Sequence, residues 1–238
     1  MRLSVNVDHI ATLREVRGAS EPEPALAALL AEQAGAAGIV THLRGDRRHI
    51  QERDLQVLRE VIKTKLNLEM AATKEMKKIA LKIKPDTVTL VPERPEELTT
   101  RGGLNVTANR RRLAPFIKDL QKGRIRICIF VDPDFKQIEA CREFNIPQIE
   151  LNTGIYAELK PGKARKKALG EVQKAAEYGS RLGLEIHAGH GLDYRNVLPI
   201  AAIPEIAELS IGFSIVARSV VVGIEKAVRE MRALIEKK

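Results

Sequence analysis

The chain has 238 residues, of which 44% are hydrophobic and 30% charged, a composition typical of a globular protein rather than a disordered one. No apolar run approaches the roughly 18 residues of a membrane span, and Asn6 and Asp8 interrupt the amino terminus before a signal-peptide core could form, so we expect a cytoplasmic protein. The net charge of +9 is compatible with nucleic acid or with anionic small molecules, but aromatic residues, at 3%, leave little for base stacking.

Strand-like and helix-like segments alternate along the whole chain. The strand candidates are rich in β-branched and other apolar residues and are bounded by Gly, Pro or Asp. They cover residues 3–10, 37–43, 65–71, 86–92, 124–132, 147–154, 183–191 and 207–217. Amphipathic stretches with helical spacing lie between them, as in residues 113–120. Pro24 suits the first turn of a helix through Leu26, and Gly35 and Gly123 stand where helices should stop.

Eight β-then-α units in this length predict a closed (β/α)8 TIM barrel, a single domain over residues 1–238 with possible extra helices. The alternative is an open doubly wound sheet. Its dinucleotide-binding fingerprint is missing from the chain.

Polar residues alternate with apolar ones near the carboxyl ends of the predicted strands. Asn6 and Asp8 share one parity of the first strand, and Glu185 and His187 share one parity of the seventh. Alternate strand residues face the barrel interior, and barrel enzymes build their sites at the carboxyl ends of the strands. We therefore expect an active site there, although any one of these residues could belong to a satisfied polar layer instead.

The titratable groups expected at this mouth are three carboxylates and several histidines. They are Asp8, Glu69, Glu150, His9, His42, His187 and His190, with His49 slightly further along its loop. Imidazoles beside carboxylates can take and return protons near neutral pH, which favours general acid–base catalysis. Zinc is the competing use, but the histidine spacing fits no strong zinc motif, and Cys128 and Cys141 lack metal-ligand spacing.

Glycines and arginines near the strand ends suggest phosphate binding. Gly189, Gly191 and Gly212 could let backbone N–H groups approach an anion, although they could equally be turn residues. Five arginines add donors near other strand ends, at positions 14, 17, 44, 47 and 48. The long connection "PERPEELTTRGGLNV" has the length and composition of a lid.

Five segments in order give the chain a resemblance that spans nearly its whole length. They are "VNVDHIATLR", "THLRGDRRHI", "NLEMAAT", "LVPERPEELTTRGGL" and "AGHGL". Together they resemble the pyridoxine 5'-phosphate synthase family of vitamin B6 biosynthesis. The resemblance implies a (β/α)8 barrel, usually a homo-octamer, that condenses 1-deoxy-D-xylulose 5-phosphate with 3-amino-2-oxopropyl phosphate. It also implies that no metal or organic cofactor is needed.

The resemblance assigns roles to individual residues. His42 and Glu69 would be proton acceptors, His190 a proton donor, and Glu150 a stabiliser of charge in the transition state. Two further groups would hold the two substrates. Asn6, Arg17, Gly191, Gly212 and the backbone of Phe213 would hold the amino-ketone phosphate, whereas Asp8, His9, Arg44, His49 and Thr99 would hold the deoxyxylulose phosphate.

Three positions depart from the pattern of the family. Phe213 and Asn152 stand where histidines are expected, and His187 stands where a residue that does not titrate is expected. The change at position 213 affects only a side-chain contact, because the backbone N–H could still meet phosphate. We keep two other functional classes open, a zinc-dependent hydrolase on the same barrel and a non-catalytic RNA-binding protein.

Overall fold

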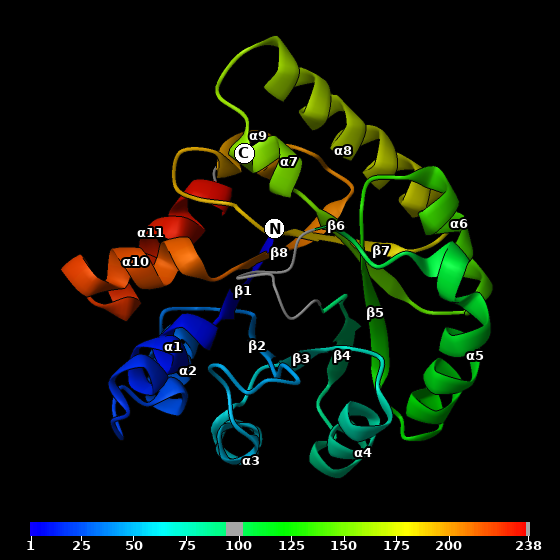
Figure 1. The fold of residues 1–238 in the computed structure, drawn as a ribbon. Helices are drawn as coiled ribbons and strands as arrows, with labels where there is room; N and C mark the ends of the chain where they lie inside the picture. Colours follow the sequence, from blue (N-terminus) through cyan, green and yellow to red (C-terminus); the bar gives the residue numbers. More distant parts are fainter. Residues whose placement is uncertain (94–101, 237–238) are drawn as a thin grey trace.

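The computed structural model describes residues 1–93 and 102–236 and confirms the predicted (β/α)8 barrel. Its parallel strands are hydrogen-bonded in sequence order, and the last pairs with the first. They are β1 (Arg2–Asn6), β2 (Gly38–His42), β3 (Leu66–Met70), β4 (Thr87–Leu90), β5 (Arg126–Val131), β6 (Gln148–Asn152), β7 (Glu185–Gly189) and β8 (Ile206–Ile211). Figure 1 shows the strands surrounded by the helices.

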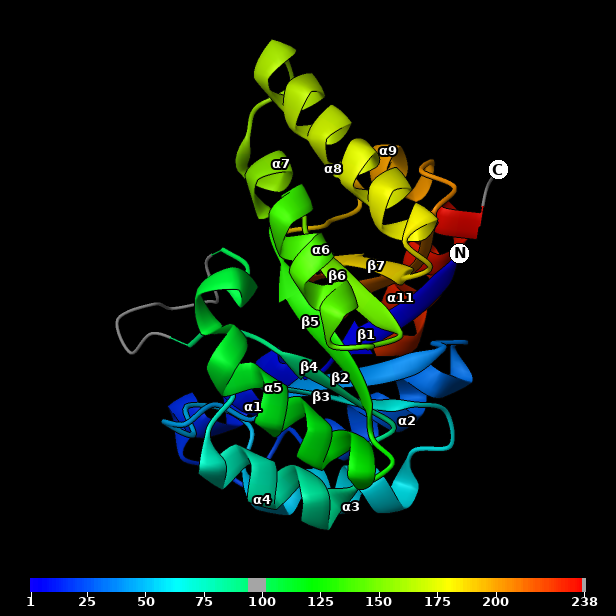
Figure 2. The ribbon, with the colours of Figure 1, turned by 90° about the vertical axis from the view of Figure 1, so that its right-hand side faces the viewer.

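Helices follow each strand, and three of the connections carry two. The first helices are α1 (Asp8–Arg17), α2 (Pro24–Gln33), α3 (Glu52–Val61), α4 (Lys74–Ile83), α5 (Val106–Lys122) and α6 (Phe135–Glu143). The others are α7 (Gly154–Glu158), α8 (Lys163–Arg181), α9 (Val197–Ala201), α10 (Phe213–Val222) and α11 (Ile224–Glu236). The expected extra helices therefore follow β1, β6 and β8. Figure 2 shows α7 and the far end of α8 extending past the barrel.

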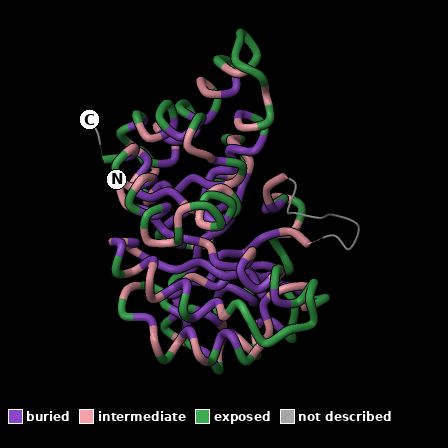
Figure 3. Tube along the Cα trace, turned by 90° about the vertical axis from the view of Figure 1, so that its left-hand side faces the viewer, coloured by how far each residue is buried: buried purple, intermediate pink, exposed green. Residues whose placement is uncertain are grey.

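The main apolar core lies between the barrel and its helices. Val5, Leu68 and Ile149 are fully buried there, whereas residues of the opposite parity make polar contacts inside the barrel. Thr89 Oγ1 donates to Asn67 Oδ1 at 2.9 Å in that interior. Figure 3 shows the buried segments concentrated in the centre of the molecule, with exposed turns around them. Within the described residues, no helix is both long and apolar enough to cross a membrane.

Local sequence signals explain several boundaries. Pro24 is the first residue of α2, and Gly123 directly follows α5, as predicted. In α2 the alanines are buried, whereas Leu26 is 59% exposed. The strand expected over 207–217 is also too long, since β8 ends at Ile211 and residues from 213 onward form α10. A short apolar run does not distinguish a buried strand from a helix by periodicity.

Candidate active site

Asp8 joins the carboxyl ends of β1 and β2. Its Oδ1 accepts hydrogen bonds from the His42 backbone N–H at 2.8 Å and from Thr41 Oγ1 at 3.2 Å. Its Oδ2 accepts from Asn6 Nδ2 at 2.8 Å, and Asn6 Oδ1 accepts from the Asp8 backbone at 2.9 Å. Because both oxygens are engaged, the buried Asp8 carboxylate holds the two strand ends in register at the mouth of the barrel.

His42 lies between two carboxyl groups, one on β3 and one in the segment after β4. Its Nε2 is 2.9 Å from Glu93 Oε1, and its Nδ1 is 4.0 Å from Glu69 Oε2. Glu93 Oε2 also accepts from the Gly45 backbone N–H at 3.0 Å. Burial raises the pKa of Glu93, but the hydrogen bonds from His42 and Gly45 outweigh it, so the pKa lies below its ordinary value. An ionised Glu93 only accepts, which places a proton on His42 Nε2 and turns Nδ1 toward Glu69.

Glu93 was not among the predicted site residues. It follows β4, in the segment interpreted as a lid, and its partner His42 lies 51 positions earlier. The sequence signal that could have indicated Glu93 is its position, because residue 93 has the same parity as Thr87 and Thr89, which face the barrel interior.

Glu69 and Glu150 are carboxyl groups held in a low-dielectric interior. Burial raises the pKa of Glu69 well above its ordinary value, and the charges of Glu150 and Asp8 add to this. Burial also raises the pKa of Glu150 to about 8, with a further contribution from Glu208. The two groups are therefore suited to carry protons near neutral pH.

Position 189 favours glycine because it packs directly against Glu150. A Cβ atom at Gly189 would lie 2.2 Å from Glu150 Oε1, so the carboxyl group occupies the space that a side chain on β7 would fill. This contact places Glu150 of β6 beside the residue that precedes His190, and so connects the carboxyl pair to the seventh strand end.

His190 follows β7 in a strained backbone conformation, with φ of 81°. The Thr153 hydroxyl lies 2.7 Å from the His190 carbonyl oxygen and 2.8 Å from that of Gly189, which holds this turn in place. Burial lowers the pKa of His190, against an opposing contribution from Glu158. Its imidazole is therefore neutral at pH 7. Thr153 was not predicted, and nothing in its own sequence context indicates this role.

His9 and His49 lie on the side of the mouth formed by the first two strand ends. Burial lowers the pKa of both imidazoles, with Asp8 acting in the opposite direction. The His49 ring centroid is 6.1 Å from that of His42, and the His9 centroid is 5.3 Å from that of Phe213. Arg44 is buried nearby, with its Nε 3.4 Å from Asp46 Oδ1. Four of the residues predicted to bind the deoxyxylulose phosphate are therefore brought to one side of the mouth, namely Asp8, His9, Arg44 and His49.

The start of α10 lies against the end of β1. A Cβ atom at Gly212 would lie 3.0 Å from the Asn6 Cβ, and Gly212 is the N-cap of the ten-residue helix. Gly191 has φ of 75°, which favours glycine, and a Cβ there would lie 2.6 Å from that of Ala157. Gly212 therefore stands at a helix N-terminus, where the helix dipole favours an anion.

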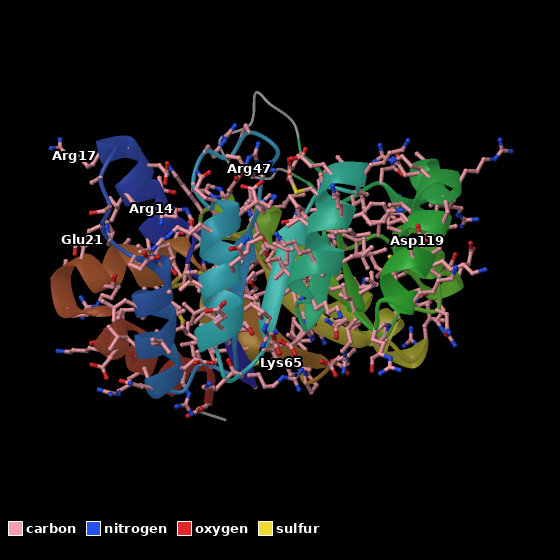
Figure 4. The ribbon with its side chains drawn as sticks, turned by 90° about the horizontal axis from the view of Figure 1, so that it is seen from below. Arg14, Arg17, Glu21, Arg47, Lys65 and Asp119 are labelled. Carbon is pink, nitrogen blue, oxygen red and sulfur yellow. The ribbon has the colours of Figure 1, made fainter. Side chains whose placement is uncertain are left out.

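Other predicted residues lie elsewhere. Arg17 is exposed at the end of α1, about 13 Å along the helix from Asp8 at 1.5 Å per residue, and points outward in Figure 4. Thr99 lies outside the described residues.

His187 turns away from the mouth, because its Nε2 is 2.8 Å from Glu185 Oε1 in the barrel interior. Asn152 donates to Asp132 Oδ1 at 2.8 Å and accepts from Gly154 N, so it fixes two strand ends.

Three of these side chains could also hold a metal ion. Ligand atoms of Asp8, His42 and Glu69 all lie within 4.8 Å of one another. Two carboxylates and one imidazole can ligate a divalent cation, so this group is where the zinc alternative would have to act.

Comparison with known proteins identifies the family. The sequence profile described as "Pyridoxal phosphate biosynthesis protein PdxJ" matches residues 3–237. The chain belongs to this family. A pyridoxine 5'-phosphate synthase of Syntrophotalea carbinolica is 52% identical over 233 residues, covering 98% of both chains. Another, from Syntrophobacter fumaroxidans, is 53% identical over 234 residues, again covering 98% of both.

Members of the PdxJ family are biosynthetic enzymes, and this chain is therefore an enzyme of that kind. Among solved structures, the KGPDC of Streptococcus mutans has a TM-score of 0.67 with 15% identity, covering 99% of this chain and 97% of the other. That likeness concerns the barrel fold alone.

Proposed function

We propose that this enzyme condenses 1-deoxy-D-xylulose 5-phosphate with 3-amino-2-oxopropyl phosphate, giving pyridoxine 5'-phosphate, inorganic phosphate and water. The observation that carries the proposal is the convergence of proton-carrying groups at one mouth. His42 Nδ1 lies 4.0 Å from Glu69 Oε2, and Glu69 is close enough to Glu150 for its charge to raise the Glu69 pKa. Family membership supports the same reaction.

The reaction needs several proton carriers. Imine formation, phosphate elimination, water addition, ring closure and aromatisation each move protons, and one base could not serve every step. In this proposal His42 and Glu69 accept protons, and a neutral Glu69 can return them. His190 donates when its imidazole has been protonated during turnover, and Glu150 stabilises developing positive charge when it is ionised.

The two phosphates are held on opposite sides of these groups in our proposal. Asn6, Gly191, Gly212 and the backbone of Phe213 bind the amino-ketone phosphate at the start of α10. The deoxyxylulose phosphate contacts a second set of residues around α1 and the loop after β2. These are Asp8, His9, Arg44, His49 and Thr99.

Arg17 is exposed at the end of α1. We retain it as a predicted contact to the amino-ketone phosphate.

We also propose that the enzyme is a homo-oligomer, an octamer, in the cytoplasm. Large apolar side chains on α1, α2 and α10 are exposed and could be covered by other copies, namely Leu13, Val16, Leu26, Val220 and Val221. Light scattering would give the number of subunits.

Absorbance of the pyridine ring tests the reaction directly when the protein is mixed with both phosphorylated ketones. Glu69→Gln, His42→Asn and His190→Asn should each abolish ring formation while the circular dichroism spectrum stays that of the folded protein. Glu60→Gln, an exposed change on α3, is the matched control and should keep full activity. Full activity of Glu69→Gln would contradict the proposed proton transfer.

A further inference from the structure

A cavity lies at the end of the barrel opposite the candidate active site. It has a volume of about 490 Å³ and is lined by the segments that precede β3, β4 and β5, together with interior side chains of the barrel. Among its lining residues is Lys65, which Figure 4 places at the opposite end of the molecule from Arg47 of the loop after β2. The cavity is therefore separate from the candidate active site, and its volume is within the range of small-molecule sites.

The lining of this cavity is rich in cations. Lys65, Lys84, Arg124 and Arg126 contribute to it. Arg126 Nη2 donates to a neutral partner, Gln148 Oε1, at 3.0 Å. Within residues 1–93 and 102–236, none of these four side chains forms an ion pair with a carboxylate.

The two acidic residues of the lining are already paired with other cations. Asp86 Oδ2 accepts from Arg59 Nη1 at 2.7 Å and from the Leu66 backbone at 2.9 Å. Glu208 accepts from Arg2 Nε at 2.9 Å and from Ser4 Oγ at 2.6 Å. The excess positive charge of the cavity is consequently available to an anion.

Two of the cations occupy strained backbone positions. Lys84 has φ of 53° and Arg124 has φ of 61°, both in the left-handed region that favours glycine. The corresponding turns before β2, β6 and β7 place Gly35, Asn145 and Gly183 in this region. A lysine or arginine is less favourable than glycine in this region, because its Cβ crowds the backbone. A positive charge toward the cavity would explain why these side chains occupy such positions.

We propose that this cavity binds a small phosphate-bearing anion. Arginine forks bind phosphate oxygens in pairs, and four cations are more than a single carboxylate needs. Lys84 and Arg124 stand on neighbouring turns, before β4 and β5, and so can contact the same ligand. Among the described residues, the His187 imidazole is the only aromatic ring that lines the cavity. We therefore do not expect a ligand that binds by base stacking.

Calorimetric titration with inorganic pyrophosphate tests the proposal. We expect Lys84→Gly/Arg124→Gly to bind one pyrophosphate fewer per chain than the unmodified protein, or to bind it at least tenfold more weakly at that site. Glycine also relieves the backbone strain at both positions, so the melting temperature without ligand should be equal to or higher than before. Lys166→Ala/Lys174→Ala, which removes two exposed cations from α8, is the matched control and should leave the titration unchanged.

Lys65→Ser provides a second variant that leaves the strained turns intact, and it should weaken the same binding event severalfold. Identical pyrophosphate stoichiometry and affinity in the unmodified protein, the double glycine variant and Lys65→Ser would overturn the proposal. Pyrophosphate can also occupy the phosphate subsites proposed for the active site, so only the binding event that the cavity variants lose or weaken is assigned to the cavity, and this difference does not depend on the proposed condensation. Ring formation at an unchanged rate in the double glycine variant would further separate this cavity from the active site.

Discussion

Glu93 Oε1 and His42 Nε2 lie 2.9 Å apart, and this hydrogen bond fixes the imidazole that faces Glu69. The carboxylate belongs to the segment after β4 and the imidazole to the end of β2, so the contact also joins two strand ends. Glu93 is a positioning residue in this arrangement. It determines which nitrogen of His42 carries the proton, and thereby which one is available to a substrate.

Glu93→Gln should lower kcat by roughly 10- to 100-fold with little change in KM, because a general acid–base group contributes its full effect, roughly 10²- to 10⁴-fold, only when it is correctly oriented. The amide can present either its oxygen or its nitrogen to His42, so the ring loses its preferred tautomer. Steady-state kinetics with both ketones measures the effect, and Glu60→Gln is the control. A loss of melting temperature with unchanged kcat would show that the contact is only structural.

The pKa of Glu150, raised to about 8, predicts that stability decreases with rising pH. The unfolded carboxyl ionises near pH 4.5, so between about pH 4.5 and 8 the folded state binds the extra proton. The stabilisation is complete below this range and is lost as the pH rises through it, at up to about 1.4 kcal/mol per pH unit. Urea denaturation between pH 6.5 and 8 measures the slope.

Glu150→Gln should make this slope shallower. Histidines 9, 49 and 190 have lowered pKa values, so near pH 6.5 they contribute a slope of the opposite sign, but they are present in both proteins and their contribution cancels in the comparison. Glu69 continues to contribute in the variant, because burial raises its pKa as well. An unchanged slope would mean that Glu150 is ionised in the folded protein, which would contradict its proposed environment.

Sequence reasoning could place the strand-end residues because strand parity is a local property. Once β2, β3 and β6 are identified, His42, Glu69 and Glu150 must face the interior near the carboxyl ends, and closure of the barrel brings them together. The same logic failed for His187, whose parity is correct but whose ring turns toward Glu185. Parity gives the face of a sheet and leaves the rotamer undetermined.

The remaining site residues depend on contacts between distant segments. Thr153 acts through the carbonyl oxygens of Gly189 and His190, more than 30 positions away, and no periodic pattern reports such a contact. The steric requirement at Gly189 likewise arises from Glu150 on the neighbouring strand. From the sequence alone, Gly189 could have belonged to an anion-binding turn or to an ordinary turn.

Gly189→Ala should impair both stability and activity. The added Cβ would lie 2.2 Å from Glu150 Oε1, so the carboxyl group must move, and overpacking of this kind costs about 1–3 kcal/mol. Gly170→Ala is the matched control. Its Cβ would meet nothing within 4 Å in the interior of α8, and alanine there should stabilise the helix by about 0.5–1 kcal/mol. Equal effects of the two substitutions would contradict the steric argument.

Metal removal distinguishes the proposed condensation from the zinc alternative. We expect purified protein to contain no stoichiometric metal and ring formation to be unaffected by a chelator, because the proposed steps use only protons. Elemental analysis and assays after treatment with a chelator provide the measurement. One zinc per chain, together with loss of activity that zinc restores, would instead assign Asp8, His42 and Glu69 as ligands.

Phe213→His tests how the first turn of α10 recognises phosphate. Phe213 is 68% exposed, and its ring and that of His9 are in a T-shaped arrangement with centroids 5.3 Å apart. If the phosphate is held by backbone N–H groups, an imidazole adds only a side-chain contact, so the KM for the amino ketone should change while kcat stays nearly constant. Kinetics with each ketone varied separately measures this. A large fall in kcat at unchanged KM would mean that position 213 acts on the chemical step through His9, and phosphate binding would then not explain its role.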